Sequence, residues 1–276
     1  MQVLKTMRNK QQKSRTKLCK SGRSSSTKKI IMFDLDGTLT KSKTVLDKEM
    51  ASLLCRLLEK RIVVVLGGGN YTQFKNQFLN FLKCAKALFK NLFILPVSGG
   101  SLYRFQNGKW RMIYKHTLTA KEKTKVQAAF RKAFYDISYI PPKKIYGGVI
   151  ENRGSQITFS ALGQKAPLNK KKVWNIKTDV RPQLRIALKK YLPNFEIRLG
   201  GLTSIDVTKK GINKAYGITE IMKLLSVSRK DVVYIGDALY EGGNDYIVKR
   251  AKIATVMVKN QKETKDFIRC FLSEQK

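Results

Sequence analysis

The sequence predicts an α/β fold, in which helices flank a mostly parallel sheet and a second α+β domain is inserted into the first. At both ends of the chain, short apolar runs alternate with segments of helical periodicity, the order that builds right-handed parallel crossovers. The middle of the chain mixes hairpin signals with helices, which is typical of a separate layer. Together these observations divide the chain into a core and an insertion.

The first core segment is expected to span residues 30–103. Apolar runs at 30–33, 62–66 and 92–95 are interpreted as buried strands. Helical spacing of apolar residues at 46–58 and again at 74–82 predicts the intervening helices. We therefore expect a three-layer, Rossmann-like core with neighbouring parallel strands.

The insertion is expected to span residues 104–206. Asn107-Gly108 separates two strand-like runs, as in a hairpin, and residues 119–122 form a capping box that opens a helix. Asp179 can cap another helix. Further strands are expected at 146–151, 156–160, 195–198 and 203–207. The core pattern resumes over residues 207–276, with strands expected at 232–235 and 253–258.

The chain of 276 residues has a formal net charge of +37. Residues 1–29 hold ten Lys and Arg and no acidic residue, which predicts a disordered basic arm and also resembles an organelle transit peptide. Such a charge attracts polyanions and steers small phosphorylated metabolites, although a lysine-biased proteome produces the same composition. Non-specific contact with nucleic acid or another polyanion, through the arm and the surface, therefore stays open.

Several classes of protein are not supported. The four cysteines lack C-x-x-C spacing and the chain has one histidine, so a zinc site, a redox pair and a His-rich metal centre have no basis. No apolar stretch has the length of a membrane span, and a secretory signal is missing. We expect a reducing, cytoplasmic location without membrane contact. A homodimer is compatible with the sequence.

Two pairs of aspartates follow strands that lie some 200 residues apart. Asp34 and Asp36 come directly after the first apolar run, and Asp237 and Asp245 follow the run at 232–235. Because the carboxyl ends of parallel strands meet at one edge of a sheet, we expect these side chains to share a site. Clustered carboxylates repel one another unless a cation joins them, and Mg²⁺ prefers carboxylate, water and phosphate oxygens.

These motifs resemble those of the haloacid dehalogenase superfamily. The segment DLDGTLT at 34–40 is similar to its motif I, and GDALYEGGND at 236–245 is similar to its motif IV. The GD-x₄-GGND form resembles eukaryotic-type phosphomannomutases and their bacterial phosphatase relatives, over residues 30–272. The resemblance implies the superfamily's Rossmann-like core, with a C2B-type cap as the inserted domain.

The resemblance also implies a mechanism. Asp34 would be the nucleophile that forms an aspartyl-phosphate, and Asp36 the general acid and base. Mg²⁺ would be held by Asp34, by the backbone carbonyl of Asp36 and by Asp237, with Asp245 behind them or on a ligand water. Lys214 lies in a G-x-x-K element similar to the one that places a cation beside the nucleophile.

The second strand departs from the family pattern. The superfamily usually ends this strand with Ser or Thr, whereas this chain has Gly67, Gly68, Gly69 and Asn70. We expect the glycine N–H groups to cradle the phosphoryl group, with Asn70 as a further donor. A turn without ligand contact explains Gly69 equally well.

The insertion departs from the pattern as well. Arg153 matches one of the arginines that hold the distal phosphate in phosphomannomutases, but Tyr146 and Gln164 stand where two others are expected. Ser204 and Asp206 match the sugar-contacting element. A glutamine replaces neither the charge nor the bidentate geometry of an arginine, so the distal phosphate should be held more weakly.

Weaker binding of the distal phosphate favours release and hydrolysis. The sequence therefore predicts a Mg²⁺-dependent phosphatase that acts on a small phosphate monoester, and a sugar phosphate is the expected substrate. One alternative is a phosphomannomutase that interconverts mannose 1-phosphate and mannose 6-phosphate. Another is a basic nucleic-acid-binding protein with a vestigial enzyme core.

Overall fold

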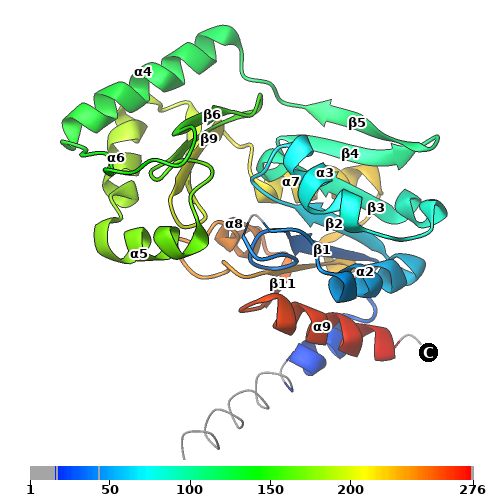
Figure 1. Ribbon diagram of the computed structural model, residues 1–276. Coiled ribbons are helices and arrows are strands. Elements are labelled where there is room, and N and C mark those ends of the chain that lie inside the picture. Colours follow the sequence, from blue (N-terminus) through cyan, green and yellow to red (C-terminus); the bar gives the residue numbers. More distant parts are fainter. Residues whose placement is uncertain (1–15, 17, 43, 275–276) are drawn as a thin grey trace, which may run out of the picture.

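A computed structural model describes residues 16, 18–42 and 44–274 (Figure 1). Two sheets organise the described chain. The core sheet has seven strands in the order β11-β10-β1-β2-β3-β4-β5, and a second sheet has four in the order β6-β7-β9-β8. The predicted fold class, a mostly parallel core sheet with a separate α+β layer, is confirmed.

Five parallel strands form the centre of the core sheet: β1 (Ile30–Asp34), β2 (Ile62–Leu66), β3 (Leu92–Leu95), β10 (Val232–Gly236) and β11 (Ala254–Met257). Helices cover both faces, so every residue of β1 and β10 is buried. One face packs against α2 (Lys48–Lys60) and α9 (Gln261–Ser273). The other packs against α7 (Lys214–Leu224) and α8 (Tyr246–Arg250).

Shorter elements connect these strands. They are α3 (Tyr71–Gln77) and the 3-10 turns η1 (Leu79–Phe81), η2 (Lys86–Asn91), η3 (Val97–Gly99) and η4 (Arg229–Asp231). The helix expected over 74–82 ends early: α3 stops at Gln77, and η1 follows it.

The core is larger than the sequence predicted. The hairpin of β4 (Ser101–Gln106) and β5 (Lys109–Lys115) pairs with β3 and extends the core sheet, so the insertion does not begin at residue 104. Leu102 packs into the core beneath α7, which explains why the hairpin stays with this sheet. At the other boundary, β9 (Ser204–Lys209) pairs with two strands of the second sheet, so the insertion continues past residue 206.

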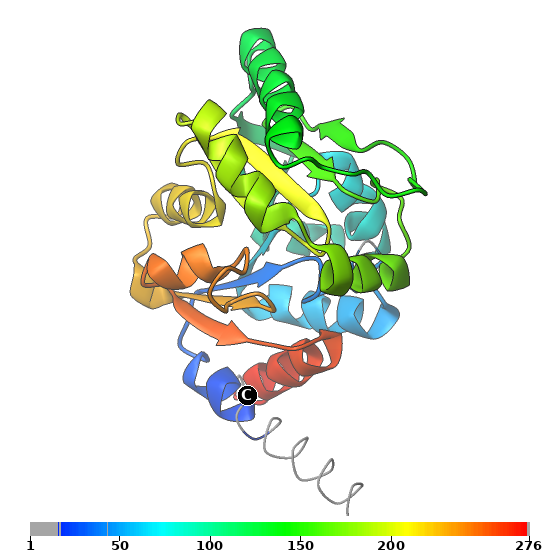
Figure 2. The same ribbon diagram turned by 90° about the vertical axis from the view of Figure 1, so that its left-hand side faces the viewer.

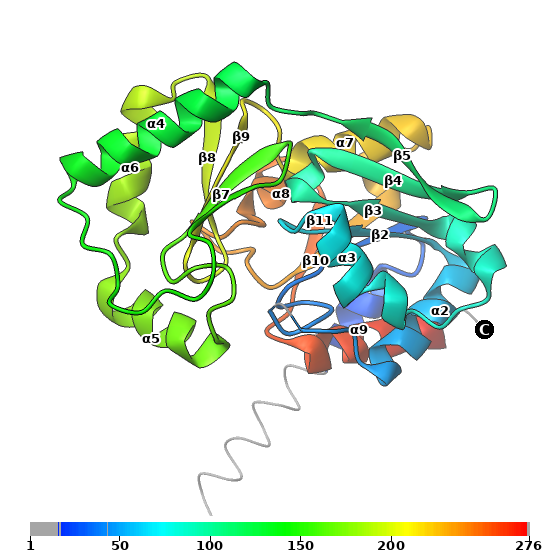
Figure 3. The same ribbon diagram turned by 45° about the horizontal axis from the view of Figure 1, so that its top comes forward.

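The inserted cap therefore lies between Lys115 and the residues after β9. Its elements are α4 (Ala120–Asp136), β6 (Ile150–Asn152), β7 (Gln156–Ser160), α5 (Leu168–Thr178), α6 (Arg181–Tyr191) and β8 (Phe195–Gly200), together with β9. Figures 2 and 3 show α4 and α6 on the outer side of the cap sheet. Phe130, Phe159 and Leu188 pack in this outer layer, which leaves the opposite face of the cap sheet turned toward the core.

The expected basic arm is partly folded. Residues 18–24 are helical, Leu18 is buried, and Gly22 lies against the backbone of Phe267 and Phe271 in α9. The sequence gave no sign of this because a short basic helix with one buried leucine lacks a readable period. Residues 1–15 and 17 of the expected arm lie outside the described residues.

The four cysteines form two disulfides, Cys19–Cys270 and Cys55–Cys84. Their partners are 251 and 29 residues apart, so local spacing could not reveal them. Disulfides persist in oxidising surroundings, which departs from the reducing location that we expected. In the described part of the chain, no helix is long and apolar enough to cross a bilayer.

Two glycines fix α7 against the end of β3. A Cβ atom on Gly217 would lie 2.6 Å from Cδ2 of Leu95 and 2.9 Å from Cα of Gly99. Gly99 has a φ of +88°, a conformation that other residues rarely adopt. The backbone of α7 can approach the core this closely only because both positions lack a side chain. This contact sets the position of Lys214, the first residue of the helix.

We predict that Gly217→Ala lowers the free energy of unfolding by about 1–3 kcal/mol, because the added methyl group overpacks this contact. Thr219→Ala, at an exposed position two residues further along α7, is the matched control and should be neutral or slightly stabilising. Urea denaturation of the two variants measures the difference. Equal stability would contradict the proposed close contact.

Candidate active site

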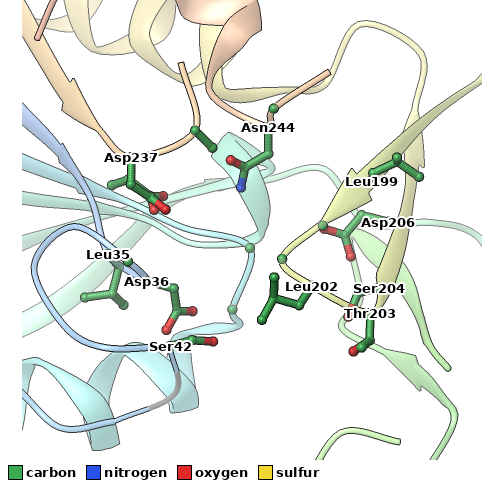
Figure 4. Close-up of a pocket in the computed structure, with 18 of the residues that line it drawn as sticks. Leu35, Asp36, Ser42, Leu199, Leu202, Thr203, Ser204, Asp206, Asp237 and Asn244 are labelled. Carbon is green, nitrogen blue, oxygen red and sulfur yellow. The ribbon is translucent and has the colours of Figure 1, made fainter. Parts of the chain in front are cut away.

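A cavity of about 830 Å³ lies between the carboxyl ends of the core strands and the open face of the cap sheet (Figure 4). Asp34, Asp36 and Asp237 line it from the core. Arg198 and Asp206 line it from the cap. The two domains thus enclose one space, with carboxylates at its floor.

The turn after β1 brings two of these carboxylates together. Gly37 has a φ of +96°, and a Cβ atom there would lie 2.6 Å from Cγ of Asp237. Glycine is therefore required, because it supplies the backbone conformation and leaves room for the Asp237 side chain. Oγ1 of Thr38 donates a hydrogen bond to Oδ1 of Asp237 at 3.2 Å. The DGT sequence of the turn thereby positions a carboxylate from the far end of the chain.

Asp34, Asp237 and Asp245 form a compact acidic cluster. Each offers an oxygen, and these oxygens lie within 4.8 Å of one another. The Lys214 ammonium lies among them, donating to Oδ1 of Asp34 and, at 2.5 Å, to Oδ1 of Asp245. Oη of Tyr234 donates to the same Asp245 oxygen at 2.6 Å. The structure therefore brings together residues from β1, α7 and the segment after β10, as the sequence predicted.

Burial sets the electrostatics of this cluster. It raises the pKa of Asp34 and of Asp237, and the neighbouring Asp245 carboxylate raises both further, while Lys214 opposes the shift. Burial also disfavours the Lys214 ammonium, but Asp245 and Asp34 outweigh it, so the pKa of Lys214 is raised and the side chain stays charged.

The donor set fits a divalent cation. One ammonium faces three carboxylates, which leaves an excess of negative charge in a largely buried space. The ligand atoms available are oxygens, and Mg²⁺ prefers oxygen ligands. Because Lys214 already contacts Asp34 and Asp245, Asp237 is the carboxylate of the cluster that does not pair with it.

Asp36 lies apart from this cluster, at the wall of the cavity (Figure 4). Its Oδ1 atom accepts a hydrogen bond from Nε2 of Gln77 at 2.8 Å. Gln77 also donates to Oγ1 of Thr40, so it ties the carboxylate to its own turn. Sequence analysis missed Gln77, because a glutamine at the end of a short helix carries no motif.

The loop at residues 67–70 contributes in part. Its two middle glycines line the cavity. Asn70 instead caps α3: its side chain accepts from the N–H of Gln73 at 2.9 Å, and the Gln73 side chain accepts from the N–H of Asn70. This use of Asn70 departs from the expected role in phosphate binding. Ser98, which lines the cavity beside Gly68, offers the hydroxyl that the second strand lacks.

Arg153 joins the cap to the core. Its Nη1 atom donates to the carbonyl oxygen of Gly68 at 2.5 Å, and Nη2 donates to Glu151 at 2.8 Å and to Oε1 of Gln164 at 3.2 Å. Gln164 in turn donates to Oγ of Ser160 at 2.9 Å. Arg153 lines the cavity, whereas Gln164 is among the hydrogen-bond partners behind it.

Ser204 and Asp206 line the cavity from β9, as Figure 4 shows. Asp206 accepts a hydrogen bond from Oγ1 of Thr158 at 2.8 Å, and Oγ of Ser204 lies 2.8 Å from that of Ser160. Both side chains are thus oriented by the neighbouring strand β7. Their expected position facing the substrate space agrees with the structure.

Sequence analysis missed the cationic lining of the cap. The cavity is also lined by Lys171, Lys172, Arg181 and Arg198. Two of them come from α5, a helix that the weak periodicity of its lysine-rich sequence did not predict. Arg198 faces Asp206 in the register of β8 and β9, so strand alternation could have placed both on one face.

Comparison with protein families gives one match over most of the chain. The family of haloacid dehalogenase-like hydrolases matches residues 31–273. Among curated proteins, phosphomannomutase 1 of Dictyostelium discoideum is 27% identical over 87% of this chain and 94% of its own length. Phosphomannomutase 2 of the same organism is 26% identical over 79% and 85%.

Solved structures share the fold. The IMP-nucleotidase of Plasmodium falciparum, truncated at its N-terminus and bound to IMP, superposes with a TM-score of 0.68 at 19% identity. The match covers 88% of this chain and 68% of that one. At this identity the likeness concerns the fold.

We predict that Mg²⁺ raises the melting temperature, and that Asp237→Asn weakens Mg²⁺ binding at least about tenfold. The unliganded variant should be no less stable, because one of three mutually repelling carboxylates is removed. Asp206→Asn, in the same cavity but outside the acidic cluster, is the control and should bind Mg²⁺ as the wild type does. Calorimetric titration measures both affinities, and equal affinities for the wild type and Asp237→Asn would rule out the assignment.

Proposed function

The chain belongs to the haloacid dehalogenase-like hydrolases, and from this premise we propose that it is a Mg²⁺-dependent phosphatase for a small phosphate monoester. We propose that Asp34 is the nucleophile and forms an aspartyl-phosphate. The observation that carries the proposal is the buried cluster of Asp34, Asp237 and Asp245, joined by Lys214 at the floor of a cavity.

Lys214 supports the role of Asp34. Its ammonium is held by Asp34 and Asp245, and it stays charged. It would offset the repulsion between the Asp34 carboxylate and an approaching phosphate dianion, in a space where burial strengthens electrostatic interactions. Mg²⁺, held by Asp34, Asp237 and the backbone carbonyl of Asp36, would neutralise charge on the phosphoryl oxygens.

Asp36 is suited to move protons. It would protonate the oxygen of the leaving group as Asp34 attacks phosphorus, and it would later take a proton from the water that hydrolyses the aspartyl-phosphate. The hydrogen bond from Gln77 holds this carboxyl group at the cavity wall. Its separation from the acidic cluster leaves it able to exchange protons while Asp34 stays ionised.

The lining favours a substrate with a second anionic or polar end. Carboxylates and glycine N–H groups lie on the core side of the cavity, and Lys171, Arg181 and Arg198 lie on the cap side. A cavity of about 830 Å³ accommodates a small metabolite. Ser204 and Asp206 offer hydrogen bonds to hydroxyl groups, which supports a sugar phosphate.

The contacts of Arg153 support a phosphatase over a mutase. Its guanidinium already donates to Gly68, Glu151 and Gln164, and so has less capacity to hold a second phosphate. A mutase must retain a bisphosphorylated intermediate while the sugar reorients. Weaker retention allows water to reach the aspartyl-phosphate first.

A phosphomannomutase is the second candidate. It is favoured by relatives that carry this name at 26% and 27% identity, and by the placement of Ser204 and Asp206 in the cavity. A nucleic-acid-binding protein with a vestigial core is less well supported. Keeping three carboxylates buried in one cluster destabilises the fold, and a core without catalysis has no use for that arrangement.

Product analysis tests the proposal. Mannose 1-phosphate is incubated with Mg²⁺ and a catalytic amount of hexose bisphosphate, and free phosphate and mannose 6-phosphate are quantified. A panel of other sugar phosphates and nucleoside monophosphates is assayed for phosphate release. We expect free phosphate from at least one monoester and little isomer. Asp34→Asn should reduce turnover by about 10³-fold or more.

The matched control is Asp136→Asn, which changes an exposed aspartate on the cap and should keep full activity. Isomer formation that outruns phosphate release would favour the mutase. Turnover retained by Asp34→Asn, with the fold intact by circular dichroism, would refute the role of Asp34.

A further inference from the structure

The amino ends of the core strands carry a second concentration of charge, on the edge of the sheet opposite the active site. Lys28-Lys29 precede β1, Lys60-Arg61 precede β2, and Arg229-Lys230 precede β10. We call these six residues the basic ridge. Each of three consecutive strands in the sheet is thus introduced by a pair of cationic residues.

The strand register places these pairs side by side. Ile30 of β1 pairs with Val232 of β10 and with Ile62 of β2. Neighbouring strands lie about 4.8 Å apart, so the three pairs form a line about 10 Å long across the edge. Lys90 before β3 and Lys252 before β11 extend this line on both sides.

Contacts within the ridge hold it in place. Nε of Arg61 donates to the carbonyl oxygen of Lys28 at 2.8 Å, and Nη2 donates to that of Ser26 at 2.8 Å. Nζ of Lys28 donates to the carbonyl oxygen of Lys230 at 2.6 Å. A cavity of about 310 Å³ lies here, lined by cationic residues from two of the pairs. The backbone thus preorganises a grooved cationic surface.

The charge of the ridge is only partly offset. Its six cationic residues are accompanied by Glu59 and Asp231, and Asp231 pairs with Lys29 at 3.2 Å. Like charges on neighbouring strands are destabilising, so an anion that lies along the ridge would relieve repulsion. The chain also enters β1 from this side, and residues 1–27 hold eight further Lys and Arg without an acidic residue.

We propose that the basic ridge binds the phosphodiester backbone of a nucleic acid. The cationic pairs are arranged in a line across neighbouring strands, which matches a chain of phosphates better than a single phosphate group. The six residues include no aromatic side chain to stack on bases, so contact through phosphates with little sequence preference follows. Because the ridge lies opposite the cap, nucleic acid and a small substrate can be bound together.

The test uses the full chain and a fluorescein-labelled, mixed-sequence 24-nucleotide RNA, with anisotropy measured from about 50 to 300 mM KCl. The ridge variant combines Lys28→Gln, Lys60→Gln, Arg229→Gln and Lys230→Gln, and keeps Lys29 and Arg61 for their structural contacts. The matched control combines Lys121→Gln, Lys125→Gln, Lys189→Gln and Lys190→Gln on the exposed surface of the cap. Both variants lower the formal charge by four, and thermal melts verify that both fold.

We expect the ridge variant to bind RNA at least about tenfold more weakly than the cap control at 150 mM KCl. Its slope of log affinity against log salt should fall by about 3 to 4, or about 1 for each lost phosphate contact. Equal losses in the two variants would overturn the proposal, because binding would then follow net charge alone. Stronger binding to phosphatidylserine vesicles than to RNA would also overturn it. This readout does not depend on phosphatase activity.

Discussion

The contact of the Lys214 ammonium with the carboxylates of Asp34 and Asp245 is the interaction on which the catalytic edge depends. It joins the end of β1, the first turn of α7 and the segment after β10. Without this cation, three carboxylates would share a buried space of a few ångströms. Removing one partner from a buried ion pair leaves a charge without compensation, which is strongly destabilising. The fold therefore positions Lys214 closely, through glycines that admit α7 to the core.

The same sheet separates two kinds of charge. Its carboxyl edge gathers aspartates around Lys214, and its amino edge gathers cationic pairs before β1, β2 and β10. The strands between them are buried on both faces and carry little charge themselves. This arrangement keeps an anionic substrate and an anionic polymer on opposite edges of one rigid layer. The strongly basic composition is then compatible with an acidic, metal-binding active site.

Much of the core and its acidic cluster could be predicted from the sequence, because each motif follows a buried strand and strand ends of a parallel sheet converge. The cap was harder to predict. The hairpin at 101–115 has the pattern of an independent layer, and its attachment to β3 depends on the packing of Leu102. Asn70 reads as a phosphate ligand but caps α3, since a capping box depends on local geometry. The cationic lining from α5 stayed hidden among surface lysines.

The central claim is that Asp34 accepts a phosphoryl group at a Mg²⁺ site. Beryllium trifluoride mimics a phosphoryl group on an aspartate oxygen, so its binding can be followed by ¹⁹F NMR without knowledge of the substrate. The account predicts bound fluoride signals that require Mg²⁺, persist in Asp136→Asn and are lost in Asp34→Asn. The same bound signals in folded Asp34→Asn, or none in the wild type at saturating Mg²⁺, would contradict it.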